Sequence, residues 1–338
     1  MGRSRRKRHG SRDKGGDGMS RIFMDGFESG DLTLWNSTGS IATQTGKSGN
    51  YCMGVSQNQI SIITLPGSYQ NIYFACKLWW SANKTYIYFF NGATALAVLG
   101  NNIAPNWSFY RGNWVTSLAA SSNPTLSSTW GLYEGWYKPK TDGTGRFTLK
   151  YNGIIIIDFT GQTADSALLV TSIQFYNPAA SSIYYVDDFI VDDAAFIGPS
   201  SIQGLAVTGA GNSAQFDPST GSNYACVDEI PPSDADYIST NVADEIDTYA
   251  CGNLTGTINS VKAVQVQARC MQEGSPAVPK IQLVTRPTST DRVSASKSVQ
   301  TFAPSTVANI WELNPDDSAA WAEADVNGME IGVKAVAS

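Results

Sequence analysis

Histidine and cysteine are scarce in this sequence, and their scarcity limits its chemistry. The single histidine, His9, lies in a basic N-terminal segment, so the rest of the chain cannot build a Ser-His-Asp or Cys-His site. The five cysteines are odd in number and include no C-x-x-C pair, so neither a disulfide framework nor a zinc site is expected. HExxH, P-loop and E-x-D-x-x-E patterns are missing as well. These absences predict a chain that is not an enzyme and has no catalytic residues.

Long apolar runs are also missing. No run reaches the length that a membrane helix needs, and the N-terminus has no hydrophobic signal core. We therefore expect no membrane contact and no export by a standard signal.

Aromatic residues and turn formers are abundant instead. The chain holds 9 Trp, 15 Tyr and 13 Phe, and its 31 Gly and 14 Pro separate short apolar runs. Aromatic and β-branched residues suit the pleated surface of a sheet, and Gly, Pro, Asn and Asp suit its turns. The sequence predicts an all-β fold with two β-sandwich, jelly-roll-like domains in tandem, a disordered basic N-terminal arm and one short helix near the C-terminus.

Composition divides the chain into four segments. We predict a basic arm over 1–19, a jelly-roll domain over 20–193, a linker over 194–203 and a second β-sandwich domain over 204–338. The linker, AAFIGPSSIQ, contains the Gly and Pro that end a strand. In the second domain VKAVQVQARCM alternates apolar and polar residues, which is typical of a strand with one face on a core.

Two short motifs predict local structure. Asn152-Gly153 between apolar runs predicts a β-hairpin, because both residues tolerate a positive φ. Asn314-Pro315 followed by two aspartates predicts the start of a helix over Asp316–Val326 that closes near Asn327-Gly328.

Charge is distributed unevenly along the chain. The first 18 residues carry seven basic and two acidic groups, a net charge of +5, whereas the whole chain carries −6 and the remainder therefore −11. The arm is either a solvated tail or a segment that contacts nucleic acid or an acidic protein surface, and we favour the tail.

Several segments resemble known proteins. DGFESGDLTLW, FTLKYNGIIIIDFTGQT and YYVDDFIVDD resemble concanavalin A-like jelly rolls of the laminin-G type, which are common in tailed-phage virion proteins. EIDTYACGNL, VKAVQVQAR and WAEADVNGMEIGVKAV are similar to a β-rich module that follows such a jelly roll in phage and prophage structural proteins. The resemblance covers roughly residues 21–338 and does not include the arm.

The resemblance implies a structural component of a phage virion, associated with the capsid or the tail and assembled in the host cytoplasm. Its partners would be copies of itself and other virion proteins. The alternative is a carbohydrate-binding or host-receptor-binding module on the phage tail, with a host-surface glycan as its partner.

Aromatic residues crowd the predicted jelly roll. Tyr86, Tyr88 and Phe90 alternate along one strand and therefore share a face. An exposed aromatic platform can stack on sugar rings, but aromatic side chains also dominate the energetics of cores, and we favour the core. The residues in question are Trp79, Trp80, Tyr86, Tyr88, Phe90, Trp107, Tyr110, Trp114, Trp130, Tyr133, Trp136 and Tyr137.

Carboxylates at the two ends of the jelly roll suggest a cofactor. In carbohydrate-binding jelly rolls, the resemblance implies a structural Ca²⁺ between a D-x-F-E-x-G segment and an aspartate of the last strand. Calcium prefers such oxygen ligands. The alternative, favoured for Asp192 and Asp193, is that the carboxylates accept hydrogen bonds from turn amides. The candidate metal ligands are Asp25, Glu28, Asp187 and Asp188.

Overall fold

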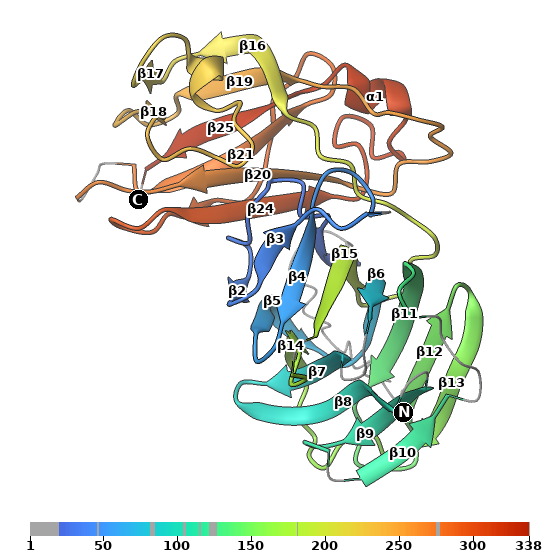
Figure 1. Cartoon of the computed structure of the whole chain (residues 1–338). Helices are drawn as coiled ribbons and strands as arrows, with labels where there is room; N and C mark the ends of the chain where they lie inside the picture. Colours follow the sequence, from blue (N-terminus) through green and yellow to red (C-terminus); the bar gives the residue numbers. More distant parts are fainter. Residues whose placement is uncertain are drawn as a thin grey trace, which may run out of the picture.

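The computed structural model describes residues 20–337 except 46, 82–84, 104–105, 115, 122–126, 181 and 275–277. The arm predicted over 1–19 lies outside the described residues. Nearly all regular elements are antiparallel β-strands, with one α-helix near the C-terminus (Figure 1). The prediction of an all-β chain built from sandwich-like units is confirmed. No helix of the described part is long and apolar enough to cross a membrane.

Two antiparallel sheets form the N-terminal sandwich. The first sheet has the order β13 (Ile154–Gly161), β12 (Gly145–Tyr151), β11 (Gly131–Lys138), β6 (Ile72–Trp80), β15 (Ile183–Asp192), β4 (Cys52–Ser56) and β3 (Ser40–Ala42), with β1 (Arg21–Asp25) also paired to β15. The second sheet has the order β10 (Thr116–Ala120), β9 (Asn106–Arg111), β8 (Thr94–Ile103), β7 (Thr85–Asn91), β14 (Val170–Tyr176), β5 (Ile60–Tyr69) and β2 (Asn36–Ser37).

Aromatic side chains fill the space between these two sheets. Phe109 of β9 stacks on Phe147 of β12 with 3.8 Å between ring centroids, and Phe74 of β6 meets Phe89 of β7 at 5.8 Å. All four rings have no measurable exposure. Burying a Phe side chain stabilises a fold by roughly 1.5–3 kcal/mol, so these pairs hold the two sheets together.

The predicted hairpin is confirmed. Strands β12 and β13 are joined at Asn152 and Gly153, whose φ angles are 48° and 82°. Positive φ at both central residues is the requirement of the type I′ turn, whose twist matches that of paired strands. Beyond the turn, Ile154 and Ile155 of the edge strand β13 are 63% and 52% exposed.

The C-terminal half contains a third sheet, two strand pairs and two short helices. The third sheet has the order β16 (Val207–Ala214), β19 (Ile246–Cys251), β25 (Glu330–Val336), β21 (Lys280–Arg286) and β22 (Arg292–Val293), with β23 (Lys297–Ser298) also on β21. The strand pairs are β20 (Val264–Cys270) with β24 (Ser305–Trp311) and β17 (Asp217–Pro218) with β18 (Ile238–Ser239). The helices are the 3₁₀ helix η1 (Asn223–Cys226) and α1 (Glu323–Asn327).

Helix α1 ends where predicted but begins later. It closes at Asn327 before Gly328, whereas its first residue is Glu323 and not Asp316. The Asn314 side chain accepts a hydrogen bond from the Asp316 amide at 3.0 Å, and the Asn314 carbonyl accepts one from Ser318 at 2.8 Å. Asn314 therefore makes a local turn instead of capping a helix, which is the competing use of this side chain.

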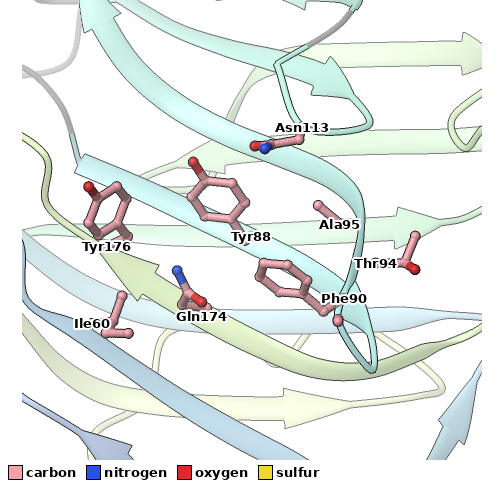
Figure 2. Close-up of a pocket in the computed structure, with 9 residues that line it drawn as sticks. Ile60, Tyr88, Phe90, Thr94, Ala95, Asn113, Gln174 and Tyr176 are labelled. Carbon is pink, nitrogen blue, oxygen red and sulfur yellow. The ribbon is translucent and has the colours of Figure 1, made fainter.

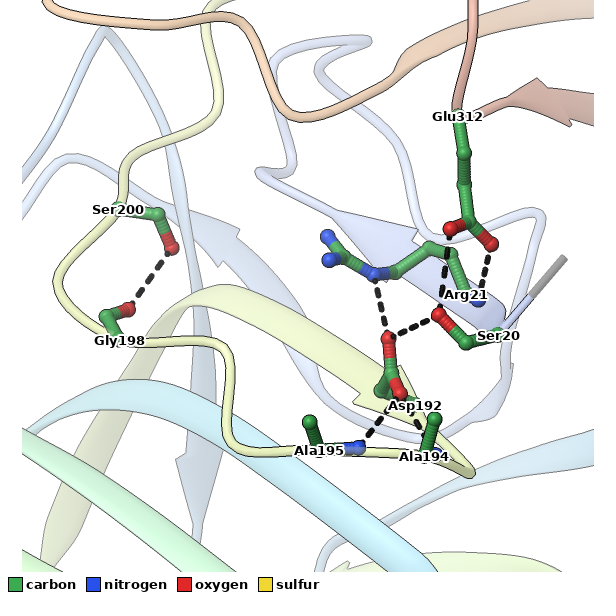
Figure 3. A network of polar contacts seen from close by, with 8 residues as sticks. All are labelled: Ser20, Arg21, Asp192, Ala194, Ala195, Gly198, Ser200 and Glu312. Atoms are coloured by element: carbon green, nitrogen blue, oxygen red, sulfur yellow. Dashed lines mark hydrogen bonds and ion pairs between the residues drawn. The ribbon is translucent and has the colours of Figure 1, made fainter. Parts of the chain in front are cut away.

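A polar network joins the two halves (Figure 3). Glu312, just after β24, accepts hydrogen bonds from the Ser20 hydroxyl at 3.2 Å and the Arg21 amide at 2.5 Å. Asp192, at the end of β15, accepts from Ser20 at 3.0 Å and pairs with the Arg21 guanidinium at 3.3 Å. The first strand is thus fastened to the last strand of its own sandwich and to the C-terminal half.

The segment 194–203 is tied to the N-terminal sandwich along its length. Asp192 Oδ1 accepts from the Ala194 and Ala195 amides at 2.8 and 3.2 Å, as predicted for an aspartate at a strand end. Farther on, the Gly198 amide donates to Glu134 at 2.8 Å and the Ile202 amide to Asp188 at 2.6 Å. The division into two domains at this segment stays a prediction.

Candidate functional site

Asp25 and Glu28, at and just after the end of β1, accept hydrogen bonds that fix the following segments of the chain. The two carboxylate oxygens of Asp25 accept hydrogen bonds from the Phe27 amide at 2.7 Å and the Trp35 indole at 2.8 Å. Burial raises the pKa of Asp25 to about 7. The Glu28 carboxylate accepts from the amides of Asn50 and Tyr51 at 2.9 and 3.0 Å. Both acids therefore satisfy backbone or ring N–H donors.

Asp187 and Asp188 lie on β15 and hold the same loop as Glu28. Asp187 accepts from the Ser48 amide at 2.8 Å, and Asp188 accepts from the Ser48 hydroxyl at 2.7 Å. The Lys77 ammonium lies 2.7 Å from Asp188, so this carboxylate already has a cation beside it. Burial, and next the charge of Asp188, raises the pKa of Asp187 to about 7.

The structure thus brings three of the four predicted metal ligands to one loop, over residues 47–51. Asp25 is separate and bonds to Trp35. Within the described residues, no group of three or more His, Cys, Asp or Glu side chains is placed to hold a metal ion. The amides around residues 48–51 and the Lys77 ammonium take the oxygens that calcium would need, so this donor set does not fit the ion. The calcium site expected from the sequence is therefore not proposed for the wild-type protein.

The aromatic residues divide into two groups. Trp80, Trp107, Tyr133 and Tyr137 belong to the main core, at 1% exposure or less. A second cluster forms apart from that core, on the opposite face of the second sheet, so the prediction that favoured the core holds for part of the set. Its members are Tyr86, Tyr88 and Val98, with Phe90, Ala95, Tyr110, Trp114 and Tyr176 packed against them.

Strand register defines this face, which we call the aromatic face. Tyr88 on β7 pairs with Gln174 on β14 and with Val98 on β8, and side chains of paired residues project to the same side. Tyr86, Tyr88 and Phe90 share it, as predicted. Among the described residues, register places only uncharged ones here: Asn36, Ile60, Ile62, Thr64, Ser172, Gln174, Tyr176, Tyr86, Tyr88, Phe90, Ala95, Val98, Gly100, Ser108, Tyr110, Ser117 and Ala120.

Trp114, in the turn between β9 and β10, folds over one end of the aromatic face. Its ring lies 4.3 Å from that of Tyr86 and 4.4 Å from that of Tyr110, and its indole N–H donates to the Tyr88 hydroxyl at 2.7 Å. Its φ is +64°, a conformation that costs a bulky residue roughly 1–3 kcal/mol. The contacts with three tyrosines supply the packing that holds Trp114 in this conformation.

A hollow of about 570 Å³ lies beside Trp114 on the aromatic face. Figure 2 shows the rings of Tyr88 and Phe90 at its centre, with Gln174 and Tyr176 on one side and Asn113 on the other. The Tyr88 and Phe90 rings lie 5.6 Å apart and only 20° from parallel. The two rings stack on each other, Tyr88 is 7% exposed and Phe90 is partly exposed, and amide and hydroxyl groups border the hollow.

The part of the aromatic face that the structure describes carries no charge at physiological pH. Burial raises the pKa of Tyr86 to about 12 and raises the pKa of Tyr88 as well, so both phenols keep their protons. Arg111 lies at the end of β9, one residue beyond Tyr110, so strand alternation directs it to the opposite side. Its guanidinium is 2.7 Å from Asp165.

Sequence reasoning missed two polar residues of the hollow. Gln174 was signalled by the alternation in TSIQFY, where it shares a face with Tyr176. Asn113 follows Gly112, whose φ of 64° marks a turn. Its position beside β7 depends on contacts far apart in the sequence, and no local pattern indicates it.

No family model matches the chain, and no curated protein matches it. Solved structures are similar in fold. A carbohydrate-binding module, CBM66 from Bacillus subtilis, has a TM-score of 0.33 and 11% identity over 48% of this chain and 97% of the other. A carbohydrate esterase of the Shiga toxin-encoding bacteriophage phi24B has a TM-score of 0.39 and 12% identity over 53% and 100%. An alginate lyase has a TM-score of 0.35 and 11% identity over 53% and 95%.

A sialidase also matches, with a TM-score of 0.36 and 10% identity. The match covers 52% of this chain and only 19% of the sialidase. The presence of a lyase, an esterase and a sialidase among these structures contradicts the prediction that the chain is not an enzyme. That prediction relied on the lack of histidine and of paired-acid motifs. Tyrosine and lysine can also transfer protons, so these absences do not exclude catalysis.

Proposed function

We propose that the aromatic face binds a carbohydrate. The observation that supports this most directly is the contiguous aromatic cluster on the side of the second sheet that points away from the main core. A sheet face outside the core ordinarily carries polar residues, and an apolar surface there marks a site of interaction. Tyr86, Tyr88 and Val98 are buried within the cluster, and the surface is formed by its partly exposed members Phe90, Tyr110, Trp114 and Tyr176. The hollow of about 570 Å³ is within the range of roughly 300–1,000 Å³ that is usual for small-molecule sites.

The chemistry of a sugar ring matches this hollow. A pyranose has faces of C–H groups, which pack on aromatic rings, and edges of hydroxyl groups, which donate and accept hydrogen bonds. Tyr88 and Phe90 supply the rings, while the Gln174 and Asn113 amides can each donate and accept. Binding sites of this kind combine apolar walls with a few polar groups that fix orientation.

Site-directed variants test this proposal. In titration calorimetry against a panel of oligosaccharides, Phe90→Ala and Gln174→Ala should each weaken binding about tenfold, which corresponds to about 1.4 kcal/mol. Trp136→Ala is the matched control, because Trp136 stacks on Tyr73 at 5.5 Å on the outer side of the first sheet. Equal binding by all three variants would place the ligand elsewhere. Assays of the same mixtures for cleaved sugar decide whether a bound glycan is also a substrate.

We further propose that the chain works on a phage virion, where a carbohydrate-binding face would contact a host-surface glycan. Support for this setting comes from the sequence segments that resemble phage jelly rolls and the module that follows them. Other virion proteins and copies of the chain would be its partners. Mass spectrometry of gradient-purified particles should find the protein in a fixed stoichiometry. A protein found only in the soluble fraction of infected cells would contradict this setting.

A further inference from the structure

Charge separates glycans into classes that need different binding sites. Uronate, sialate and sulfated polymers carry anions, and an anion taken out of water needs a cationic partner or several strong donors. A neutral glycan needs only ring faces and groups that exchange hydrogen bonds with hydroxyls. The charges on and around the aromatic face therefore indicate which class it accepts.

The described residues of the aromatic face offer no cation to an anionic sugar. Register places no Lys, Arg or His on it among the described residues. Arg111, the basic residue of β9, is directed to the other side and paired with Asp165 at 2.7 Å. No Asp or Glu of the described part lies on this face either. The described face therefore has no carboxylate that could bind an ammonium group of a ligand or hold a metal ion that bridges to an acidic sugar.

The remainder of the chain adds a second, independent argument. The whole chain carries −6 and its first 18 residues +5, so the folded part is strongly acidic at −11. Such a body repels a polyanion at long range and lowers its rate of association. Short-range contacts and the overall field therefore disfavour the same class of ligand.

We infer that the aromatic face is specific for an uncharged, hydroxyl-rich glycan and rejects uronate-, sialate- and sulfate-bearing polymers. This inference rests on the proposed function, and it names the class of ligand for that same site. Gln174 and Asn113 suit neutral sugars because each amide both donates and accepts, as hydroxyl and acetamido groups do. The aromatic rings bind through apolar contact, which does not depend on charge.

The test compares two sets of ligands on the whole chain. The neutral set contains hexamers of cellulose, xylan, mannan and chitin, and the acidic set contains oligogalacturonate, alginate oligosaccharides and polysialic acid. We expect binding within the neutral set only, and a change of less than twofold in affinity between 50 and 500 mM NaCl, because salt screens ion pairs but not stacking. Phe90→Ala should reduce this binding about tenfold and Trp136→Ala should leave it unchanged.

A gain-of-function variant tests the charge argument directly. Gln174→Lys places an ammonium group in the hollow, and it should raise the affinity for an acidic oligosaccharide at least fivefold at 50 mM NaCl, with loss of the gain at 500 mM. Melting curves of each variant show whether the sandwich still folds. If Gln174→Lys unfolds the sandwich, the wild-type comparison of the two ligand sets still decides.

The outcomes separate the inference from the function on which it rests. Acidic glycans bound by the wild type, with the binding lost in Phe90→Ala, would overturn the inference and leave carbohydrate binding on this face intact. Steep salt dependence of that binding would overturn it as well. No binding to either set would overturn both proposals together.

Discussion

Trp114 lies directly over Gly100, and the two residues fit only because Gly100 has no side chain. A Cβ at this position would come within 2.3 Å of the Trp114 ring and 2.8 Å of the Tyr86 ring. Gly100 lies on β8 next to Tyr86 in register, so the aromatic face has a gap at the place where the indole rests.

Gly100→Ala should therefore displace Trp114 and loosen that end of the aromatic face. We expect a loss of about 1–3 kcal/mol in the free energy of unfolding, as for other overpacked sites, and a shift in tryptophan fluorescence. Gly143→Ala is the control, since nothing lies within 4 Å of its added Cβ. Identical unfolding curves for the wild type and Gly100→Ala would contradict the packing of Trp114 described above.

A second prediction concerns pH. Burial raises the pKa of Asp25 from its ordinary 3.8 to about 7 in the folded protein, so between these values the folded state binds more protons than the unfolded state. The stabilisation is complete below about pH 4 and is lost as the pH rises to about 7. The stability of the wild type relative to Asp25→Asn should fall with pH in this window, by at most about 1.4 kcal/mol per pH unit. Urea titrations at each pH measure it, and a constant difference would contradict the prediction.

A third prediction concerns Lys77 and calcium. Lys77→Met removes the cation beside the buried Asp188, and we expect a loss of about 2–4 kcal/mol in the free energy of unfolding. Millimolar calcium should then raise the Tm of this variant by mass action and leave the wild type unchanged. Lys262→Met, at an exposed position, controls for the lost surface charge. A higher Tm of the wild type in calcium than in chelator would contradict this prediction and support the metal site expected from the sequence.

The fourth prediction concerns the two halves. Their hydrophobic clusters share no residue, so cleavage within 194–203 should give two pieces that each unfold cooperatively. Each piece should have a lower Tm than the intact chain, because separation breaks the hydrogen bonds from Ser20 and Arg21 to Glu312. Calorimetry of the separated pieces measures both effects. A piece with no cooperative transition would show that the boundary is misplaced.

Strands with strict alternation and clear turns could be predicted from the sequence, as β20 and the hairpin of β12 and β13 show. Strand β5 could not, because Pro66 and Gly67 interrupt its pattern within Ile60–Tyr69. The aromatic face was predicted only in part. Strand β7 carries aromatic or apolar residues on both sides, so the sequence cannot tell which side faces the core. The place of Trp114 depends on a positive φ and on contacts with two other strands.

The fastening at Asp192 and Glu312 also determines how the protein bears mechanical load. Tension between a ligand on the second sheet and an attachment on the C-terminal half passes from one sheet to the other through the core, and then along β15. This strand is bonded to β6, β4 and β1. At its end, the hydrogen bonds of Ser20 to Asp192 and Glu312 connect it to the segment just after β24. A force along β15 would therefore act on its pairings with three neighbouring strands and on the hydrogen bonds to Glu312, and not on the rings of the hollow, which lie on the other sheet.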